Sequence, residues 1–589
     1  MTTPPALPSL VRRSRDPLVY RNALDAGVPE VVARVIAGRG LPPGTDIRRF
    51  LEAKLSDLDP PGTLADIDRA AGRVANAILS GEVLALATDY DCDGLDAHGV
   101  LHTALVKSFK HPGEKLRGFV GHRLKEGYGI CEAIANRILA DRPRASVLIT
   151  ADNGSSDETQ IARLKSAQVD VCVADHHEIP KEGPPQSAFA VINPQRADCR
   201  YPDDAIAGGM VAWLLMCAVR QRLIEADHLP VSANPLVELL DYVAMSTVCD
   251  AVSMASVNNR AVVRAGLALM NARPRACWQA LKSLLNVSLI TADTLGWSFG
   301  PLLNGQTRMS DGEVALAFLL SEDVESARPI AEVLVASNEA RKRVEREMLR
   351  VALAQAESSV AAGRAGLALL LEDGHAGVIG LCSSRIVERF GRPTFVFAPK
   401  HGEPDLVTGS GRSIEGVHLR DALQRIADQH PGLQNRYGGH RAACGSAVGL
   451  KNFQMFAEAF DEAVRSQIGE RELRPMRYSD GDLAPHELSL ETVQKLEILE
   501  PTGRGFERAA FDGLFTVQDV RTVGDGTHLK LLLEYGGRRV PGIWFKARAN
   551  AEAPLPLERG ESAHFVYGLR LNEFRGERRL DVVIEARVG

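Results

Sequence analysis

The stretch VLALATDYDCDG, residues 83–94, decides how the rest of the sequence is interpreted. Its apolar start, residues 83–87, predicts a short buried strand, and three acids follow at alternate positions: Asp89, Asp91 and Asp93. Alternate residues of an extended segment point the same way, so we expect the three carboxylates to share one side. They would repel one another unless a multivalent cation held them. The alternative is an acidic turn on the surface, because Asp and Gly favour turns.

The overall composition is that of a large globular protein without a general basic excess. The chain has 589 residues, of which 45% are hydrophobic and 24% are charged, and its formal net charge is -6. This length predicts about three to five domains. Because the chain has no net positive charge that would attract nucleic acid, any binding of nucleic acid must come from a local cleft.

The nine cysteines are scattered along the chain and form no CxxC pair. This pattern argues against a zinc ribbon and against a disulfide scaffold, and it favours a reducing cytoplasm. The N-terminal residues lack the apolar core of a signal peptide. The sequence contains no run of about 18 apolar residues, so no membrane span is expected. We therefore expect a cytoplasmic protein that does not contact a membrane.

Residues 70–195 alternate between helical and strand-like patterns. The segments LRGFVG, SVLITA, VDVCVAD and FAVINP predict further strands, and helical patterns separate most of them. Strands alternating with helices imply an α/β domain with a mostly parallel sheet and covered faces. In such sheets ligands bind at the carboxyl ends of the strands.

Chemically active side chains follow the predicted strands at this edge. Asp152 follows SVLITA, and Asp175, His176 and His177 follow VDVCVA. Asp250 ends a later apolar helix, for which polar helix termination is the alternative. The histidine pair has its own alternative, since it could simply cap a helix. Together with the first acidic stretch, these residues predict a single constellation.

Carboxylate and imidazole ligands without a thiolate suit Mn²⁺ or Mg²⁺. A pair of such ions about 4 Å apart can activate a bridging water and steady the attacking and leaving oxygens at phosphorus. The ligand types therefore predict a metal site with one or two ions, of the kind used in phosphoryl transfer.

The rest of the chain divides by pattern into further units. The predicted divisions are a helical lead-in (1–70), the α/β domain (71–290), a linker with a long connector helix (291–364), a smaller α/β domain (365–470) and a C-terminal β-barrel (471–589). We expect the charged connector helix to be exposed to solvent because it is longer than a typical helix of a globular protein. Evenly spaced short strands make an OB-fold a plausible barrel, used for single-strand binding; a β-domain used only for packing is the alternative.

Four segments in order resemble the successive motifs of the DHH phosphoesterase family: DYDCDG, ADNGSS, ADHHEIP with VINP, and VAMSTVCDAV with NNR. Other segments, including HRLKEGYGI, SFGPLLNGQTRM, TGSGRSIEG and YGGHRAACG, are similar to the RecJ branch of that family, single-strand-specific exonucleases. The resemblance covers the chain from about residue 70 to its end. It implies that the two α/β domains are DHH and DHHA1 domains and that the barrel is an OB-fold.

The resemblance also implies roles for the matching residues. The metal ligands would be Asp89, Asp91, Asp93, Asp152, His176 and Asp250, with Asp152 bridging two ions. His177 would contact the phosphate or assist the leaving group, and Asp175 would orient a histidine from behind, as is common at metal sites.

Substrate-binding positions are implied in the same way. Arg123, Arg308, Ser410 and Arg412 match residues that hold DNA phosphates, including the 5′ end, and His440 matches a glycine-rich DNA-contacting element. Arg suits this role because its planar fork is bidentate to phosphate. For each arginine the alternative is a surface ion pair.

Several residues depart from the family pattern. Asp96 stands where Thr or a small residue is usual, and such an acid could alter metal affinity or narrow substrate access. Leu302 and Leu303 replace an arginine and the apolar residue after it, so one phosphate contact could be missing. Gly374 replaces a tryptophan, and GRGFERAAF lacks an Asn-Pro pair. None of these changes removes a metal ligand, so they indicate a divergent member of the family.

The resemblance implies a metal-dependent 5′→3′ exonuclease that degrades single-stranded DNA to 5′-mononucleotides in recombination and repair. One alternative is a DHH phosphodiesterase acting on short oligonucleotides or cyclic dinucleotides, and another is a non-catalytic DNA-binding scaffold. Single-stranded DNA is the expected partner, and a single-strand binding protein or a helicase is a family-level expectation. We expect a monomer.

Overall fold

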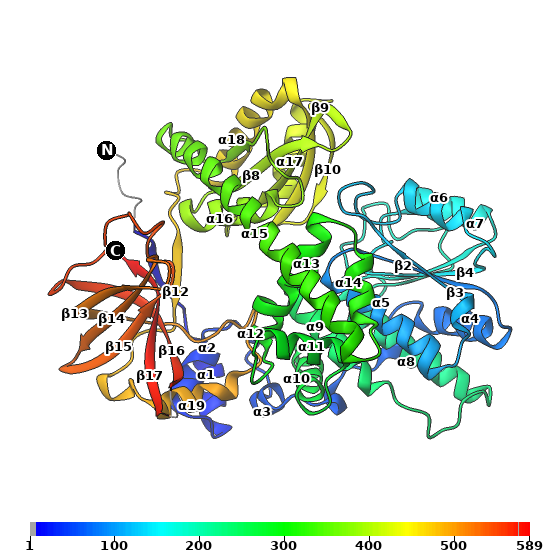
Figure 1. Cartoon of the computed structure of the whole chain (residues 1–589), viewed down its shortest axis with the longest axis horizontal. Coiled ribbons are helices and arrows are strands. Elements are labelled where there is room, and N and C mark those ends of the chain that lie inside the picture. The colour runs from blue at the N-terminus through cyan, green and yellow to red at the C-terminus, as the bar shows by residue number, and fades with distance from the viewer. Residues whose placement is uncertain (1–6, 575–576) are drawn as a thin grey trace.

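The computed structural model describes residues 7–574 and 577–589. Figure 1 shows three units: a domain with a parallel sheet on the right, a smaller α/β domain at the top and a β-barrel on the left. Helices connect the right-hand domain to the barrel along the lower part of this view. The predicted α/β class with a C-terminal barrel is confirmed.

The first sheet has five parallel strands in the order β3-β2-β4-β5-β6. The strands are β2 (Leu84–Thr88), β3 (Leu116–Val120), β4 (Val147–Ala151), β5 (Asp170–Ala174) and β6 (Ala190–Ile192). Thr88 is in register with Ala151, and Ala151 is in register with Ala174. The residues that follow β2, β4 and β5 therefore leave the sheet side by side.

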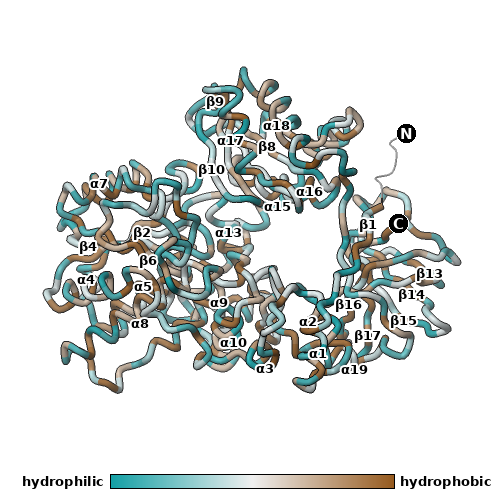
Figure 2. Tube along the Cα trace, turned by 180° about the vertical axis from the view of Figure 1, so that it is seen from behind, coloured by the Kyte–Doolittle hydropathy of each residue, from teal (hydrophilic) through white to brown (hydrophobic). Residues whose placement is uncertain are grey.

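Helices cover both faces of this sheet, as Figures 1 and 2 show. The helices are α4 (Ile67–Leu79), α5 (Cys92–Thr103), α6 (Glu132–Ala140), α7 (Glu158–Ser166) and α8 (Gly208–Glu225). Helices α6 and α7 pack on one face, and α4, α5 and α8 pack on the other. With both faces covered, the strands are largely apolar, as expected of a parallel sheet.

The acidic stretch differs from the prediction in one respect. The strand lies one residue later than expected, and the helix after it already begins at Cys92, so Asp93 lies in a helix and not in an extended segment. Asp91 caps this helix by accepting hydrogen bonds from the backbone N–H groups of Asp93 and Gly94. The capping interaction favours a helix start over a longer strand. The three acids still converge, but through a strand-to-helix turn.

A helical extension follows the sheet domain and leads to the long connector. Its helices are α9 (Leu240–Cys249), α10 (Val257–Ala272), α11 (Ala276–Leu284), α12 (Ala292–Thr294), α13 (Gly300–Met309), α14 (Glu313–Leu319) and α15 (Val324–Ala361). The prediction of a long helix is confirmed, but its description as solvated is wrong for one face. Ala327, Ala331, Ala352 and Ala356 are fully buried because α15 packs against both α/β domains. The connector is therefore a structural support.

The smaller α/β domain has a mixed sheet in the order β10-β11-β9-β8-β7. Its elements are β7 (Leu367–Leu370), α16 (Ile379–Phe390), β8 (Thr394–Lys400), β9 (Glu403–Arg412), α17 (Leu419–Gln429), β10 (Gln434–Gly439), β11 (Ala443–Gly449) and α18 (Phe453–Ile468). The glycine-rich segment YGGHRAACG, for which no strand was predicted, forms the antiparallel pair β10–β11.

The C-terminal strands close into a barrel in the order β13-β14-β15-β17-β16. These strands are β13 (Phe511–Val523), β14 (His528–Tyr535), β15 (Arg538–Trp544), β16 (Ser562–Phe574) and β17 (Glu577–Val588), preceded by β12 (Met476–Ser479) and α19 (Leu490–Leu496). The predicted C-terminal barrel of evenly spaced short strands is thus confirmed.

The N-terminal lead-in joins the barrel to the helical extension. It contains β1 (Ser9–Arg12), α1 (Pro17–Asp25), α2 (Glu30–Ala37) and α3 (Ile47–Leu51). Figures 1 and 2 both place α1 and α2 beside the barrel and close to α10. The purely helical prediction missed β1, which pairs in parallel with β12. Its partner lies so far along the chain that no local pattern reveals it.

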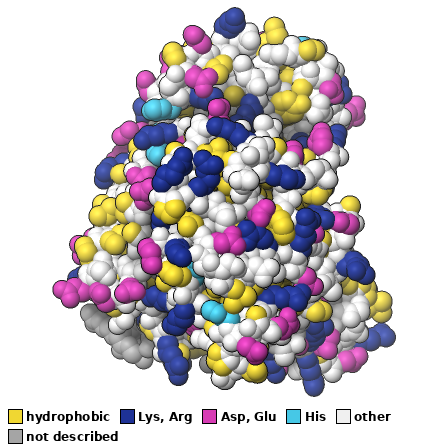
Figure 3. Space-filling model, turned by 90° about the vertical axis from the view of Figure 1, so that its right-hand side faces the viewer, with side chains coloured by type: hydrophobic (Ala, Val, Ile, Leu, Met, Phe, Trp, Pro, Cys, Tyr) yellow, Lys and Arg dark blue, Asp and Glu magenta, His cyan; other side chains and the backbone are white. Residues whose placement is uncertain are grey.

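Charges of both signs are mixed over the face shown in Figure 3, and Lys and Arg do not form one continuous basic field there. This agrees with the formal net charge of -6. Among the helices that the structure describes, none has the length and apolar character needed to cross a membrane.

Candidate metal and phosphate site

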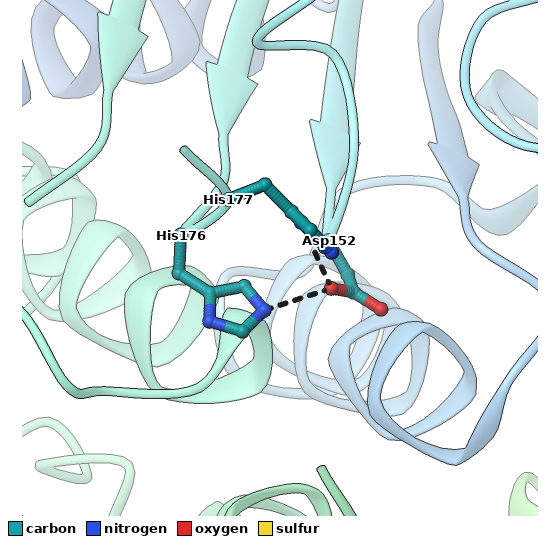
Figure 4. Close-up of side chains that lie close together, drawn as sticks. All are labelled: Asp152, His176 and His177. Atoms are coloured by element: carbon teal, nitrogen blue, oxygen red, sulfur yellow. Dashed lines mark hydrogen bonds and ion pairs between the residues drawn. The ribbon is translucent and has the colours of Figure 1, made fainter. Parts of the chain in front are cut away.

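The centre of the site is formed by Asp152, His176 and His177 at the carboxyl edge of the parallel sheet (Figure 4). Asp152 follows β4 and the two histidines follow β5. His176 Nε2 lies 3.1 Å from Asp152 Oδ1, and His177 Nδ1 lies 3.8 Å from the same oxygen. One carboxylate oxygen thus faces two imidazoles, and the residues that follow these two strands lie close together.

Two further groups of possible ligands share members with this centre. His176 Nε2 lies 3.5 Å from Asp93 Oδ2 and 3.7 Å from Asp250 Oδ2. Asp89 and Asp91 form a group with Asp152, in which the ligand atoms lie within 4.8 Å of one another. All six residues predicted as metal ligands therefore come together, and Asp152 and His176 each belong to two groups.

Asp93 is held by backbone and side-chain donors that the sequence analysis missed. Its two oxygens accept hydrogen bonds of 2.8 Å from the backbone N–H groups of Gly208 and Gly209 at the start of α8, and Ser246 donates to it at 2.5 Å. A Cβ on Gly208 would lie 2.8 Å from that of Asp152. The motif AIAGGM therefore needs glycine here because α8 begins against the site.

Burial of the acids makes the cluster unfavourable without a cation. The pKa of Asp152 is raised well above its ordinary value by burial and by the neighbouring carboxylates. The pKa values of Asp89 and Asp250 are raised by burial and by their acidic neighbours in the same way. Several carboxylates and one imidazole form a donor set that suits Mn²⁺ or Mg²⁺. The residues present therefore fit a divalent metal ion.

Asp175 and His177 form a close pair beside the ligands. Asp175 Oδ1 lies 2.8 Å from His177 Nδ1 and also accepts from the backbone N–H of His176. Burial opposes protonation of His177, but Asp175 raises the pKa of this histidine to about 9. Tyr128 Oη lies 3.0 Å from the same nitrogen. Tyr128 was not predicted, although it belongs to the quoted segment HRLKEGYGI.

Three arginines gather next to the acidic cluster. The Arg123 guanidinium lies over the ring of Tyr90, 4.2 Å from its centroid, and Arg308 on α13 donates to the carbonyl of Gly377 at 2.9 Å. Burial and the proximity of Arg123 and Arg412 lower the pKa of Arg308 to about 9. Within the described residues no carboxylate lies at ion-pair distance from any of these three arginines. The surface ion-pair alternative is therefore not what the structure shows.

Ser410 and Arg412 lie on β9 against the start of α16. Arg412 Nη1 donates to Ser410 Oγ at 3.1 Å, and a Cβ on Gly380 would lie 2.9 Å from that oxygen and 3.1 Å from Arg412 Nη2. The N-terminal turn of α16 thus approaches both side chains. A helix N-terminus beside arginine and serine forms a suitable anion site.

His440 brings the smaller α/β domain to the centre of the site. Its ring stacks on His177 with 5.7 Å between ring centroids, and its Nδ1 lies 3.3 Å from Glu178 Oε1. Glu178 directly follows the histidine pair and was not singled out from the sequence. All thirteen predicted site residues thus lie in or beside one region, contributed by two domains.

The structure shows where the unusual residues lie and rules out one of the effects expected of Asp96. Asp96 is fully buried on α5, and Cys92 Sγ lies 3.3 Å from its Oδ2, so it cannot narrow substrate access. Leu302 and Leu303 belong to the hydrophobic core. A Cβ on Gly374 would lie 2.9 Å from that of Leu371, so a tryptophan has no room in this chain.

Comparison with known proteins agrees with this architecture. Residues 84–247 match the N-terminal domain of the DHH family, residues 363–466 match the DHHA1 domain, and residues 479–586 match the RecJ OB domain. The fold and the site therefore define a DHH phosphoesterase that carries DHHA1 and OB domains. The single-stranded-DNA-specific exonuclease RecJ of Escherichia coli (strain K12) is 34% identical over 578 residues, which cover 95% of this chain and 96% of the relative. The chain belongs to the RecJ family.

Solved structures support the same assignment. The crystal structure of RecJ in complex with Mn²⁺ from Thermus thermophilus matches with a TM-score of 0.78 and 25% identity, covering 98% of this chain and 79% of the other. The complex with Mg²⁺ from the same organism shares the fold, with a TM-score of 0.73 at 24% identity over 99% of this chain and 78% of the other. The resemblance inferred from the motifs is confirmed.

Proposed function

We propose that this protein is a metal-dependent exonuclease that degrades single-stranded DNA from the 5′ end and releases 5′-mononucleotides. One observation carries the proposal: a buried cluster of acids and histidines lies beside three arginines that no carboxylate neutralises among the described residues. A cation and a phosphate group together would complement these charges. The RecJ relatives, named as single-stranded-DNA-specific exonucleases, support the choice of substrate.

Six residues would hold the metal, which we propose to be Mn²⁺ or Mg²⁺. They are Asp89, Asp91, Asp93, Asp152, His176 and Asp250. When bound, such ions supply Lewis acidity that stabilises charge at phosphorus. The sharing of Asp152 and His176 between groups supports two neighbouring ions.

The arginine cluster would hold the 5′ phosphate of the strand. Arg123, Arg308 and Arg412 place three positive charges together, and Ser410 with the start of α16 adds hydrogen-bond donors. Arginine is well suited to bidentate binding of phosphate. Because Tyr90 lies between Asp89 and Asp91, the Arg123 contact with Tyr90 places this cluster next to the metal ligands. A terminal phosphate held there would orient the first phosphodiester toward the acids.

Hydrolysis requires a water oxygen to bond to phosphorus while the bond from phosphorus to the 3′ oxygen breaks. The 3′ oxygen then takes a proton and leaves with the released nucleotide. His177 is suited to supply that proton because Asp175, 2.8 Å from its Nδ1, favours the charged form of the imidazole. Its Nδ1 interacts with Asp175, so Nε2 is the nitrogen left for the substrate. His440, stacked on His177, would contact the DNA beside it.

Two other functions predict different results in the same assay. A phosphodiesterase for cyclic dinucleotides or short oligonucleotides would prefer those substrates to long strands. A scaffold would bind DNA without cleaving it, although the complete ligand set argues against a lost site. We propose product analysis with Mn²⁺ on single strands labelled at the 5′ or 3′ end and on cyclic dinucleotides. Early release of labelled mononucleotide from the 5′-labelled strand alone supports the proposal.

Asp152→Ala tests the site directly. Because Asp152 belongs to two ligand groups, we expect loss of nuclease activity by about 10³-fold or more, while DNA binding survives. Asp170→Ala, at the opposite end of the neighbouring strand β5, is the matched control and should keep full activity. Full activity of purified Asp152→Ala protein would overturn the assignment, and chelation followed by Mn²⁺ addition should abolish and restore activity of the unaltered protein.

The remaining features of the proposal concern the setting of the reaction. All nine cysteines are free, which supports a reducing compartment such as the cytoplasm. A monomeric state and a partnership with single-strand binding protein or a helicase in recombination and repair stay predictions.

A further inference from the structure

The segment that enters the barrel forms a tight turn against the residues that follow α9. Gly503 and Phe506 exchange two backbone hydrogen bonds of 3.0 and 3.2 Å, which leaves Arg504 and Gly505 at the tip. This turn belongs to GRGFERAAF, the segment that lacks the Asn-Pro pair usual in the family.

The base of the turn is fixed to the helical extension of the DHH domain. Arg260, fully buried on α10, donates to the carbonyls of Leu499, Glu500 and Pro501 at 2.9–3.2 Å. Phe506 is also fully buried, and the Arg260 guanidinium lies 5.0 Å from the centroid of its ring. A turn anchored in this way presents its tip in one position.

The tip of the turn rests on the residues that follow Asp250. The backbone N–H of Met254 donates to the carbonyl of Arg504 at 2.7 Å. Gly505 has a φ of +75°, and a Cβ there would lie 2.4 Å from Ser253 Oγ, so only glycine fits. The turn is therefore shaped to approach the end of α9, where Asp250 is located.

The Arg504 side chain is exposed and has no carboxylate at ion-pair distance among the described residues. Its backbone carbonyl is hydrogen-bonded to Met254, four residues after Asp250, whereas Arg123 lies over Tyr90, which stands between Asp89 and Asp91. The arginines proposed to hold the 5′ phosphate and Arg504 thus border different members of the ligand set. A strand whose first phosphate lies at one border would continue toward the other.

We propose that Arg504 binds an internucleotide phosphate of the DNA strand on the 3′ side of the scissile bond. The inference rests on the proposed exonuclease function, and it assigns to the barrel-entering turn a contact with the part of the strand that remains after each cleavage. Arg504 is a substrate-binding residue in this proposal, and it favours polymers over dinucleotides, which lack that phosphate.

The first test measures binding of a 5′-phosphorylated single strand of 12 nucleotides in EDTA, over a range of salt concentrations. Removing one phosphate contact lowers the slope of log K against log salt by about 0.7. We expect this change in Arg504→Ala, with affinity reduced roughly tenfold at low salt. Arg222→Ala, near the far end of α8 and paired with Asp68 and Glu225, is the matched control and should behave like the unaltered protein.

The second test locates the phosphate. Single strands carry one uncharged methylphosphonate at the first or second phosphodiester 3′ of the scissile one, and cleavage is measured as kcat/KM with Mn²⁺. At one of the two positions, we expect the modification to lower kcat/KM of the unaltered protein about tenfold relative to the unmodified strand. The same modification should lower kcat/KM of Arg504→Ala less than twofold relative to the unmodified strand. Cleavage of the 5′-phosphorylated dinucleotide should be the same in both proteins.

The outcomes separate this inference from the proposed function. Equal losses in Arg504→Ala on the dinucleotide and on the long strand would show that Arg504 only supports Asp250 and would overturn the inference. Additive effects at both modified positions, or an unchanged salt slope, would overturn it too. If the unaltered protein does not cleave single strands while still binding them, the proposed function fails and the binding test alone decides on Arg504.

Discussion

Asp175 illustrates how a residue that is not a metal ligand supports the site. It lies just beyond β5, is fully buried, and accepts from His176, His177 and Ser155. Burial would raise the pKa of Asp175, but its contacts with the histidines lower it instead. The carboxylate therefore stays charged, fixes the orientation of the His177 imidazole and holds the backbone of His176.

At the residue scale, we expect Asp175→Asn to reduce kcat by about 10- to 100-fold, the usual cost of losing a carboxylate behind a metal-site histidine. An amide keeps the shape but cannot hold His177 as its charged form. Single-turnover rates with Mn²⁺ measure the effect. Asp170→Asn, at the start of the same strand, serves as control, and an equal loss there would attribute the effect to the strand rather than to the site.

The ligand residues show which parts of the site could be predicted from the sequence. Asp152, Asp175 and the histidines follow apolar strands, so their place at one sheet edge follows from the parallel topology. The position of Asp93 within a helix could not be predicted from the sequence. Helix capping by Asp91 and continuation of the strand differ over only a few residues there. The burial of Asp96 depends on packing between α5 and its neighbours, which local sequence does not encode.

At the scale of elements, the buried Arg260 connects α10, the lead-in and the segment before the barrel. It donates to Phe50 and to three successive carbonyls before the turn at residues 503–506, and its pKa is lowered to about 9 by burial. The sequence analysis treated NNR only as a family motif. The role of its arginine appears only when segments about 240 residues apart meet.

We expect Arg260→Leu to lower the free energy of unfolding by about 3 kcal/mol or more, because several buried carbonyls lose their donor. Arg264→Leu, one turn further along α10 with longer contacts of 3.2 and 3.4 Å, should cost less than about 1 kcal/mol. Urea unfolding of both variants measures the difference. Similar stabilities of the two variants would contradict the anchoring role of Arg260.

Asp512 at the start of β13 connects the barrel to the lead-in. Its buried carboxylate accepts from Arg12, Ser479 and His564. Burial opposes the charged form, but these hydrogen bonds lower the pKa of Asp512 below its ordinary value. Because the folded state releases this proton more readily than the unfolded state, the stabilisation is present above about pH 4. It is lost as the pH falls through the folded-state value.

Asp512→Asn should therefore lower stability by roughly 2 kcal/mol at pH 7, and the difference from the unaltered protein should shrink as the pH falls below about 4. Thermal unfolding at several pH values provides the measurement. Asp519→Asn, on the exposed part of the same strand, is the control. A difference that stays constant from pH 7 to pH 3 would contradict the role of the Asp512 charge.

At the scale of the whole molecule, α15 fixes the position and orientation of the two α/β domains relative to each other. Its 38 residues span about 57 Å, and its two ends pack in different hydrophobic clusters. Arg308 lies in the helical extension of the first α/β domain, and Ser410 and Arg412 lie in the smaller α/β domain. The proposed phosphate site thus exists only if the helix holds both domains in register.

Insertion of one alanine after Arg343 on α15 would rotate the DHHA1 domain by about 100° relative to the helix before it. We expect activity on single strands to fall by about 10²-fold or more because the arginine cluster separates. Circular dichroism should show unchanged helix content, and Ala352→Ser serves as a mild control in the same helix. Retained activity after the insertion would mean that α15 does not set the geometry of the site.

The pairing of β1 with β12 has a consequence for the order of events during synthesis. Ser9 pairs with Met476, so one of the first strands to be made waits for a partner about 470 residues later. At about 5–20 residues per second, the ribosome needs roughly 25–90 s to supply it. The beginning of the chain therefore reaches its final place late, and the speed of translation sets how long that strand remains open to wrong partners.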